Sequence, residues 1–92
     1  MISMLHIQNA TQYDPRRIVV EGDVRVGEIE VGQRVFLRRR KFIIDAITVG
    51  RESGLQKVIA PAQCEVILKS VLPIPIPPEV LRYAQGQVVQ AL

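Results

Sequence analysis

The stretch that decides the fold runs from residue 20 to residue 35 and reads Val20-Glu21-Gly22-Asp23-Val24-Arg25-Val26-Gly27-Glu28-Ile29-Glu30-Val31-Gly32-Gln33-Arg34-Val35. Its first residues are largely β-branched, and apolar Val24 and Val26 alternate with charged neighbours, which predicts a strand with one buried face. Gly27 and Gly32 predict turns, because glycine adopts backbone conformations that other residues avoid. Gly22 interrupts the strand, where it indicates a bulge or the close approach of another backbone.

The alternation continues towards the C-terminus beyond this stretch. Val35 and Leu37 lie two residues apart and predict the buried face of the next strand. Phe36 then falls on the opposite face, together with Arg34 and Arg38. We therefore expect one exposed aromatic side chain between two arginines.

Three more apolar segments predict further strands: residues 42–49, 64–71 and 87–90. An apolar strand is also expected near the N-terminus, around His6. Only residues 78–84 read as helical, over one or two turns, with a proline at the first position, where the missing N–H costs nothing. Short strands joined by glycine turns, without long helices between them, predict an all-β fold, either an antiparallel barrel or a sandwich.

The spacing within residues 20–35 resembles the signature V-x-G-x-V-x-x-G-x-I-x-V-G-x-x-V of the second, β-barrel domain of translational GTPases such as elongation factor Tu. Later segments resemble other strands of that domain, so the resemblance covers roughly residues 4–91. It implies a small closed antiparallel β-barrel of the translation elongation factor second-domain type. Two features depart from the family's pattern. Ala60-Pro61 stands where Ala-Gly is usual, and the proline-rich stretch at residues 73–78 is longer than the usual connector.

Length and motifs limit the classes of function. The 92 residues suffice for one module, so we expect a single domain over residues 1–92. The sequence contains no G-x-x-x-x-G-K-[ST] phosphate loop and no partner motif for guanine or magnesium, so we expect neither nucleotide binding nor GTPase activity. In the family that the chain resembles, this barrel is a non-catalytic module that touches ribosomal RNA or the acceptor end of tRNA.

We also expect no enzymatic activity, no cofactor and no metal site. One histidine, His6, one cysteine, Cys64, and scattered acidic residues supply no nucleophile with its base, no paired carboxylates and no ligand cluster. A single cysteine forms no intramolecular disulfide, which fits a reducing compartment. Because no basic leader precedes an apolar run and no apolar run approaches roughly 18 residues, we expect a cytoplasmic protein without a membrane span.

Four adjacent cations are the most suggestive local feature of a chain with 12 Lys and Arg against 9 Asp and Glu. We expect them at the tip of a hairpin, where exposed guanidinium groups pair with phosphate oxygens. The alternative is that charges at a tip only keep the turn solvated and the strand edge unpaired. Two further arginines could extend the patch, although their distance from the tip does not follow from the sequence. The nucleic-acid-binding candidates are Arg38, Arg39, Arg40, Lys41, Arg16 and Arg17.

Phe36 is a further candidate contact, for a base or for a protein. The alternative is that a loop or another subunit covers it, since four aromatic residues are too few for an extended stacking platform. Residues 75–78, Pro-Ile-Pro-Pro, have the spacing of a polyproline ligand. The ordinary explanation is a stiff connector whose Ile74 and Ile76 dock on the barrel.

The leading hypothesis is a non-catalytic binding module that contacts RNA or a ribosome-associated complex through the basic hairpin tip. The alternative is a protein-interaction or self-assembly module, a homo-oligomer without a nucleic-acid role. A solitary barrel would expose faces that neighbouring domains cover in the family, and such faces favour association. A third reading is that the chain is a piece of a larger factor.

Overall fold

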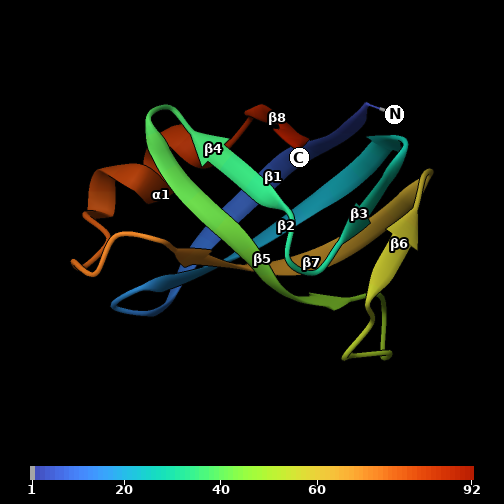
Figure 1. The fold of residues 1–92 in the computed structure, drawn as a ribbon, viewed down its shortest axis with the longest axis horizontal. Helices are drawn as coiled ribbons and strands as arrows, with labels where there is room; N and C mark the ends of the chain where they lie inside the picture. The colour runs from blue at the N-terminus through green and yellow to red at the C-terminus, as the bar shows by residue number, and fades with distance from the viewer. Residues whose placement is uncertain (1) are drawn as a thin grey trace.

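The computed structural model describes residues 2–92 as eight strands and one short helix (Figure 1). In chain order the elements are β1 (Ser3–Asp14), β2 (Arg17–Val26), β3 (Glu28–Glu30), β4 (Arg34–Leu37), β5 (Arg40–Thr48), β6 (Lys57–Ile59), β7 (Ala62–Ser70), α1 (Pro78–Ala84) and β8 (Val88–Ala91). Within this range, no helix is long and apolar enough to cross a membrane. The expected all-β class, with one short helix near the C-terminus, is confirmed.

Six strands form one antiparallel sheet in the order β4-β5-β7-β2-β1-β8. The sheet curls until its edges meet, where Arg34 of β4 and Leu92, the residue after β8, exchange backbone hydrogen bonds of 2.9 Å in both directions (Figure 1). The result is a nearly closed antiparallel barrel, one of the two architectures that the strand pattern predicts and the one that the resemblance implies. Strand β6, which the sequence does not predict, pairs with β3 as a separate two-stranded sheet.

The core fills the inside of the barrel because side chains alternate between the two faces of each strand. In β4, Val35 and Leu37 point inward and Phe36 points outward, as predicted. The largest fully buried side chains are Phe42, Leu5, Ile7, Ile18, Ile29, Leu37, Ile44, Ile47 and Leu68. Each such side chain contributes roughly 1.5–3 kcal/mol when it leaves water, so apolar burial holds the barrel together without a disulfide.

The backbone of β1 approaches β2 closely at Gly22. A Cβ at this position would lie 2.4 Å from the backbone oxygen of His6. The pairing register between β1 and β2 shifts at the same point. Ile7 pairs with Gly22 and Asn9 pairs with Glu21, so β1 contains one additional residue between these pairs. The close approach is therefore confirmed, and the irregularity in the ladder lies in the facing strand.

The predicted alternation fails at the end of β2. Val24 is buried, but Val26 is half exposed. Met4 pairs with Val26 and Leu5 pairs with Val24, so β2 contains one additional residue, Arg25, at this point. Such a bulge shifts the side chain that follows to the other face of the strand. This shift corrects the prediction that Val24 and Val26 share the buried face.

The segment between β7 and α1 docks on the barrel through one of its two candidate isoleucines. Ile76 is buried, and its N–H donates to the carbonyl oxygen of Pro15 at 2.7 Å. Ile74 is half exposed, contrary to prediction. Helix α1 covers the predicted residues and buries Val80 and Ala84 against the core. The helix is thus fixed at the end of the barrel that carries the β1–β2 and β4–β5 turns (Figure 1).

Candidate nucleic-acid interface

Positive charge gathers at one end of the barrel. The β1–β2 turn, the β4–β5 turn, the end of β7 and α1 lie together there, on the left in Figure 1. This basic end holds eight of the chain's 12 Lys and Arg: Arg16, Arg17, Arg38, Arg39, Arg40, Lys41, Lys69 and Arg82. Its acidic residues are Asp14, Asp45 and Glu79, and the other six of the 9 Asp and Glu lie elsewhere. The charge is therefore segregated along the barrel, which the net charge of +3 does not reveal.

The β4–β5 turn contains two of the four adjacent cations, not all four. Leu37 pairs with Arg40 as the last rung of the ladder, so only Arg38 and Arg39 form the turn. Arg40 and Lys41 belong to β5. The strands extend closer to the tip than the sequence predicts, because the hairpin closes with a turn of minimal length.

Arg40 ties the segment after β7 to the barrel. Its Nε donates to the hydroxyl oxygen of Ser70 at 3.1 Å, and its Nη2 donates to the carbonyl oxygen of Ile74 at 3.0 Å. A second acceptor for Nη2, the carbonyl of Pro75, lies at 3.5 Å. Because these contacts use its guanidinium, Arg40 positions the loop rather than offering a free donor to a ligand.

Arg16 approaches the same serine from the β1–β2 turn. Its Nη2 donates to the carbonyl oxygen of Ser70 at 3.1 Å, and the N–H of Ser70 donates to the carbonyl oxygen of Arg16 at 2.8 Å. Ser70 is almost fully buried, so the two arginines meet around it. The sequence leaves the distance between Arg16 and the basic tip open, and the structure brings both to one residue. Nε of Arg16 is buried without a hydrogen-bond partner.

Arg17 is neutralised locally. Its Nε lies 2.6 Å from a carboxylate oxygen of Asp14, Nη1 lies 3.5 Å from Asp45, and the guanidinium stands 4.8 Å from the ring centre of Tyr13. The hydrogen bond to Asp14 raises the pKa of Arg17. Burial raises the pKa of Asp14, but the hydrogen bonds from Arg17 and from the Arg16 N–H outweigh it and hold that pKa below its ordinary value. Arg17 therefore stabilises the turn and is not free for phosphate.

Arg38 lies over the ring of Tyr83, an aromatic residue that no sequence pattern singles out. Its Cζ stands 4.2 Å from the ring centre of Tyr83, which belongs to α1 and is partly buried. Together with Arg39, Arg40 and Leu72, these two side chains line a pocket of about 450 Å³. No local pattern links Tyr83 with the β4–β5 turn, because the two meet only when α1 docks on the barrel.

The remaining cations of the basic end have no ion pair or side-chain hydrogen bond with any of residues 2–92. They are Arg39, Lys41, Lys69 and Arg82. Arg39, Lys69 and Arg82 are exposed, and Lys41 is partly buried in β5. These side chains are available to an anionic ligand without loss of an internal contact.

Phe36 lies where the sequence places it. The side chain is 45% exposed on the outer face of β4, and Phe36 pairs with Lys41 across the ladder. An exposed ring and an ammonium group thus lie side by side near the basic end, because cross-strand partners project from the same face.

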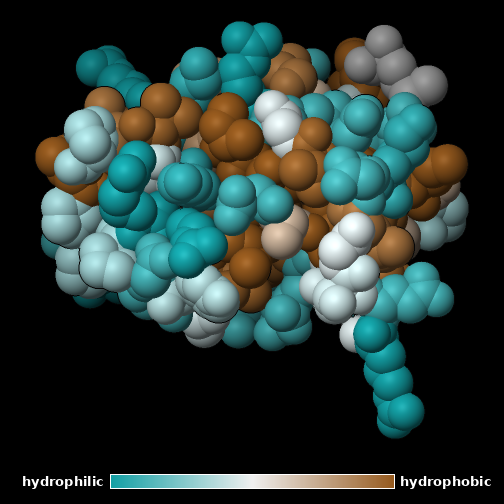
Figure 2. Space-filling view, turned by 60° about the horizontal axis from the view of Figure 1, so that its bottom comes forward, coloured by the Kyte–Doolittle hydropathy of each residue, from teal (hydrophilic) through white to brown (hydrophobic). Residues whose placement is uncertain are grey.

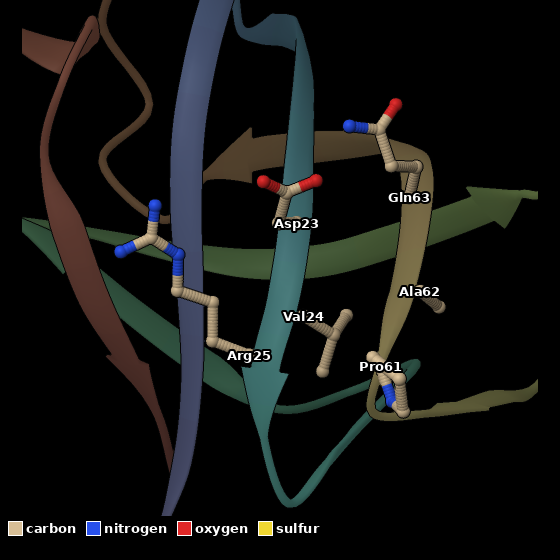
Figure 3. Close-up of a pocket in the computed structure, with 6 residues that line it drawn as sticks. All are labelled: Asp23, Val24, Arg25, Pro61, Ala62 and Gln63. Carbon is tan, nitrogen blue, oxygen red and sulfur yellow. The ribbon is translucent and has the colours of Figure 1, made fainter.

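Another pocket lies away from the basic end, between β2 and β7 (Figure 3). It has a volume of about 480 Å³ and is lined by Asp23, Val24, Arg25, Pro61, Ala62 and Gln63. Its two charged side chains are engaged: Asp23 accepts a hydrogen bond from Gln8 at 3.0 Å, and Nη2 of Arg25 lies 2.8 Å from Nδ1 of His6. No group of three His, Cys, Asp or Glu in the described part of the chain is arranged to hold a metal ion.

Neither a family model nor a curated protein matches this chain. The resemblance to the second domain of translational GTPases accordingly rests on the residues quoted above, and any role drawn from it is a proposal.

Proposed function

We propose that this protein is a non-catalytic binding module that contacts RNA, or a ribosome-associated complex through its RNA, by the basic end of the barrel. The observation that carries the proposal is the gathering of eight of 12 cations at one end, with four of them free of internal partners. A phosphate backbone is the polyanion that such a surface fits.

The arrangement favours recognition of the backbone over recognition of sequence. Lysine and arginine contacts to phosphates supply most of the affinity of such interfaces, whereas sequence is distinguished by contacts with base edges. The four free cations come from three separate elements, β5, β7 and α1, in addition to the β4–β5 turn. They therefore cover a surface several phosphates long rather than a single anion site.

The resemblance of residues 20–35 to a translation-factor barrel supports the same role, since that barrel touches RNA without catalysing a reaction. Fold alone does not determine function, so this support is an analogy. We place the protein in the cytoplasm, where ribosomal RNA is found and where the free thiol of Cys64 stays reduced.

The proposal is tested by neutralising free cations and measuring salt dependence. The four free cations are changed to Gln, singly and together: Arg39, Lys41, Lys69 and Arg82. Binding to a fluorescein-labelled RNA is then followed by anisotropy over a salt series. Each lost phosphate contact should reduce the slope of log affinity against log salt by about 0.7 for a single strand. Arg51→Gln, at an exposed position outside the basic end, is the matched control. Unchanged slopes in the quadruple variant would exclude the basic end as the RNA contact.

A second candidate function, a protein contact, is favoured by apolar side chains at the opposite end. Ile2, Val26 and Ile59 are 59, 50 and 65% exposed and surround Gly27. A Cβ at Gly27 would touch the backbone oxygen of Ile2 at 2.4 Å, and the Gly27 carbonyl accepts a hydrogen bond from Ala60, next to Ile59. Figure 2 shows hydrophobic side chains reaching the surface at this end, on the right. Sedimentation should detect self-association at micromolar concentration that Ile59→Lys abolishes. A monomeric wild-type protein would exclude a homo-oligomer.

A further inference from the structure

The backbone of Arg38 adopts a conformation that arginine normally avoids. Its φ is 57°, and it is the one non-glycine residue between positions 2 and 92 with a positive φ. Glycine is the usual residue at the first position of a two-residue hairpin turn with this geometry. Strain of this kind persists where surrounding contacts hold it, and it concentrates at functional positions.

The contact that holds Arg38 is the ring of Tyr83. The guanidinium lies 4.2 Å from the ring centre, which is the geometry of a cation–π pair. Tyr83 is fixed in turn, because its neighbour Ala84 and the preceding Val80 are buried in the core. The arginine side chain and the aromatic ring therefore form a preorganised stacked pair at the edge of the basic end.

The pocket beside this pair has the size and chemistry for one nucleotide. Its volume is about 450 Å³, and half-exposed Leu72 adds an apolar side chain to its lining. Small-ligand pockets fall within roughly 300–1,000 Å³. Every charged residue that lines it between positions 2 and 92 is an arginine, Arg38, Arg39 or Arg40, so an anionic ligand meets no carboxylate there.

We infer that this pocket takes one unpaired RNA base, stacked against the Arg38–Tyr83 pair, while Arg39 and Lys41 hold the adjacent phosphates. The inference rests on the proposed RNA-binding function and adds to it a preference for single-stranded RNA. Unpaired bases stack on aromatic rings and on arginine planes, whereas bases in a duplex are already stacked on each other and cannot enter such a pocket.

The test compares three probes that share phosphates but differ in free bases: a single-stranded RNA, its blunt-ended duplex and inorganic polyphosphate. The variants are Tyr83→Leu, which removes the ring but keeps an apolar side chain, and Tyr83→Phe, which keeps the ring. Arg38→Gly removes the guanidinium without altering α1, so it serves if Tyr83→Leu does not fold. A 2-aminopurine base in the single strand reports stacking directly through quenching of its fluorescence.

We expect wild-type protein to bind the single strand more tightly than the duplex and to quench 2-aminopurine. Tyr83→Leu should lower the affinity for the single strand roughly 5- to 150-fold, the effect of losing one base–aromatic stack, and abolish quenching. Its affinities for duplex and polyphosphate, and its salt slope, should match wild type, as should all properties of Tyr83→Phe.

Two outcomes would overturn the inference, and only the second would also overturn the proposed function. If wild type binds single strand and duplex equally and Tyr83→Leu has no effect, the pocket takes no base, while RNA binding through the basic end stands. If wild type binds none of the RNAs at low salt, the proposed function fails together with the inference.

Discussion

The strained turn at Arg38 allows stability and binding to be separated by substitutions at one position. Arg38→Ala removes the guanidinium but keeps a Cβ, so the chain retains the unfavourable backbone conformation at a φ of 57°. Arg38→Gly removes the guanidinium and the Cβ together, so that strain disappears. Both variants lose the contact with the Tyr83 ring.

The difference between the two variants can be estimated from these terms. The left-handed conformation costs an L-residue roughly 1–2 kcal/mol that glycine avoids. The greater flexibility of glycine in the unfolded chain offsets roughly 0.5–1 kcal/mol of this gain. We therefore expect Arg38→Gly to have a free energy of unfolding about 1 kcal/mol above that of Arg38→Ala, equivalent to roughly 4–8 °C in Tm for a domain of this size.

Compared with wild type, Arg38→Ala loses the cation–π contact, about 0.5–1 kcal/mol at an exposed site, and Arg38→Gly stays close to wild type or exceeds it. Urea unfolding followed by circular dichroism measures stability, and anisotropy with single-stranded RNA measures binding. We expect both variants to bind RNA equally weakly although their stabilities differ. If Arg38→Gly is less stable than Arg38→Ala, the strain argument is refuted. If Arg38→Gly binds RNA with wild-type affinity, a role for the guanidinium in binding is refuted.

Four further predictions concern single residues. Arg40→Gln should lower the free energy of unfolding by about 1.5–3 kcal/mol in urea titrations, because it breaks charged hydrogen bonds, whereas Arg39→Gln should change it by less than about 0.5 kcal/mol; equal effects would contradict the positioning role of Arg40. Gly22→Ala should lower the free energy of unfolding by about 1–3 kcal/mol, since its Cβ would meet a backbone oxygen at 2.4 Å. An unchanged Tm would contradict the close approach of the two strands. Burial, assisted by a nearby carboxylate, raises the pKa of Cys64 to about 11, so a thiol reagent at pH 8 should modify the cysteine in urea but not in native protein. The hydrogen bonds that lower the pKa of Asp14 stabilise the fold at pH values above its ordinary pKa of 3.8, and this contribution is lost as the pH falls through the pKa of the folded state. The difference in free energy of unfolding between wild type and Asp14→Asn should therefore shrink in acid; a difference independent of pH would contradict this linkage.

The elements that follow from local signals agree with the structure. The helix occupies the predicted residues 78–84, because proline at its start and the glycine at position 86, with a φ of 84°, both act locally. The long strands β5 and β7 lie within two residues of their predicted bounds. Strand β6 has only three residues, too few for a pattern, and it exists through its pairing with β3. Likewise Val26 is turned outward by a bulge that depends on pairing with β1.

The candidate site divides in the same way. Phe36 is on the outer face because alternation along β4 is a local property, and Arg38 and Arg39 stand at the turn that the sequence predicts. Whether a cation remains free of internal partners does not follow from the local sequence. Arg40 and Arg17 are occupied by partners that reach them only in the folded barrel.

The sequence by itself therefore determined the strand pattern, the antiparallel all-β class and the position of the β4–β5 turn, since each depends on residue type and spacing within a few positions. Only the tertiary structure decided which cations remain free and that Tyr83 meets Arg38. The reason is physical: side-chain partners are chosen by the closure of the sheet and the docking of α1, which bring together residues that no local periodicity relates.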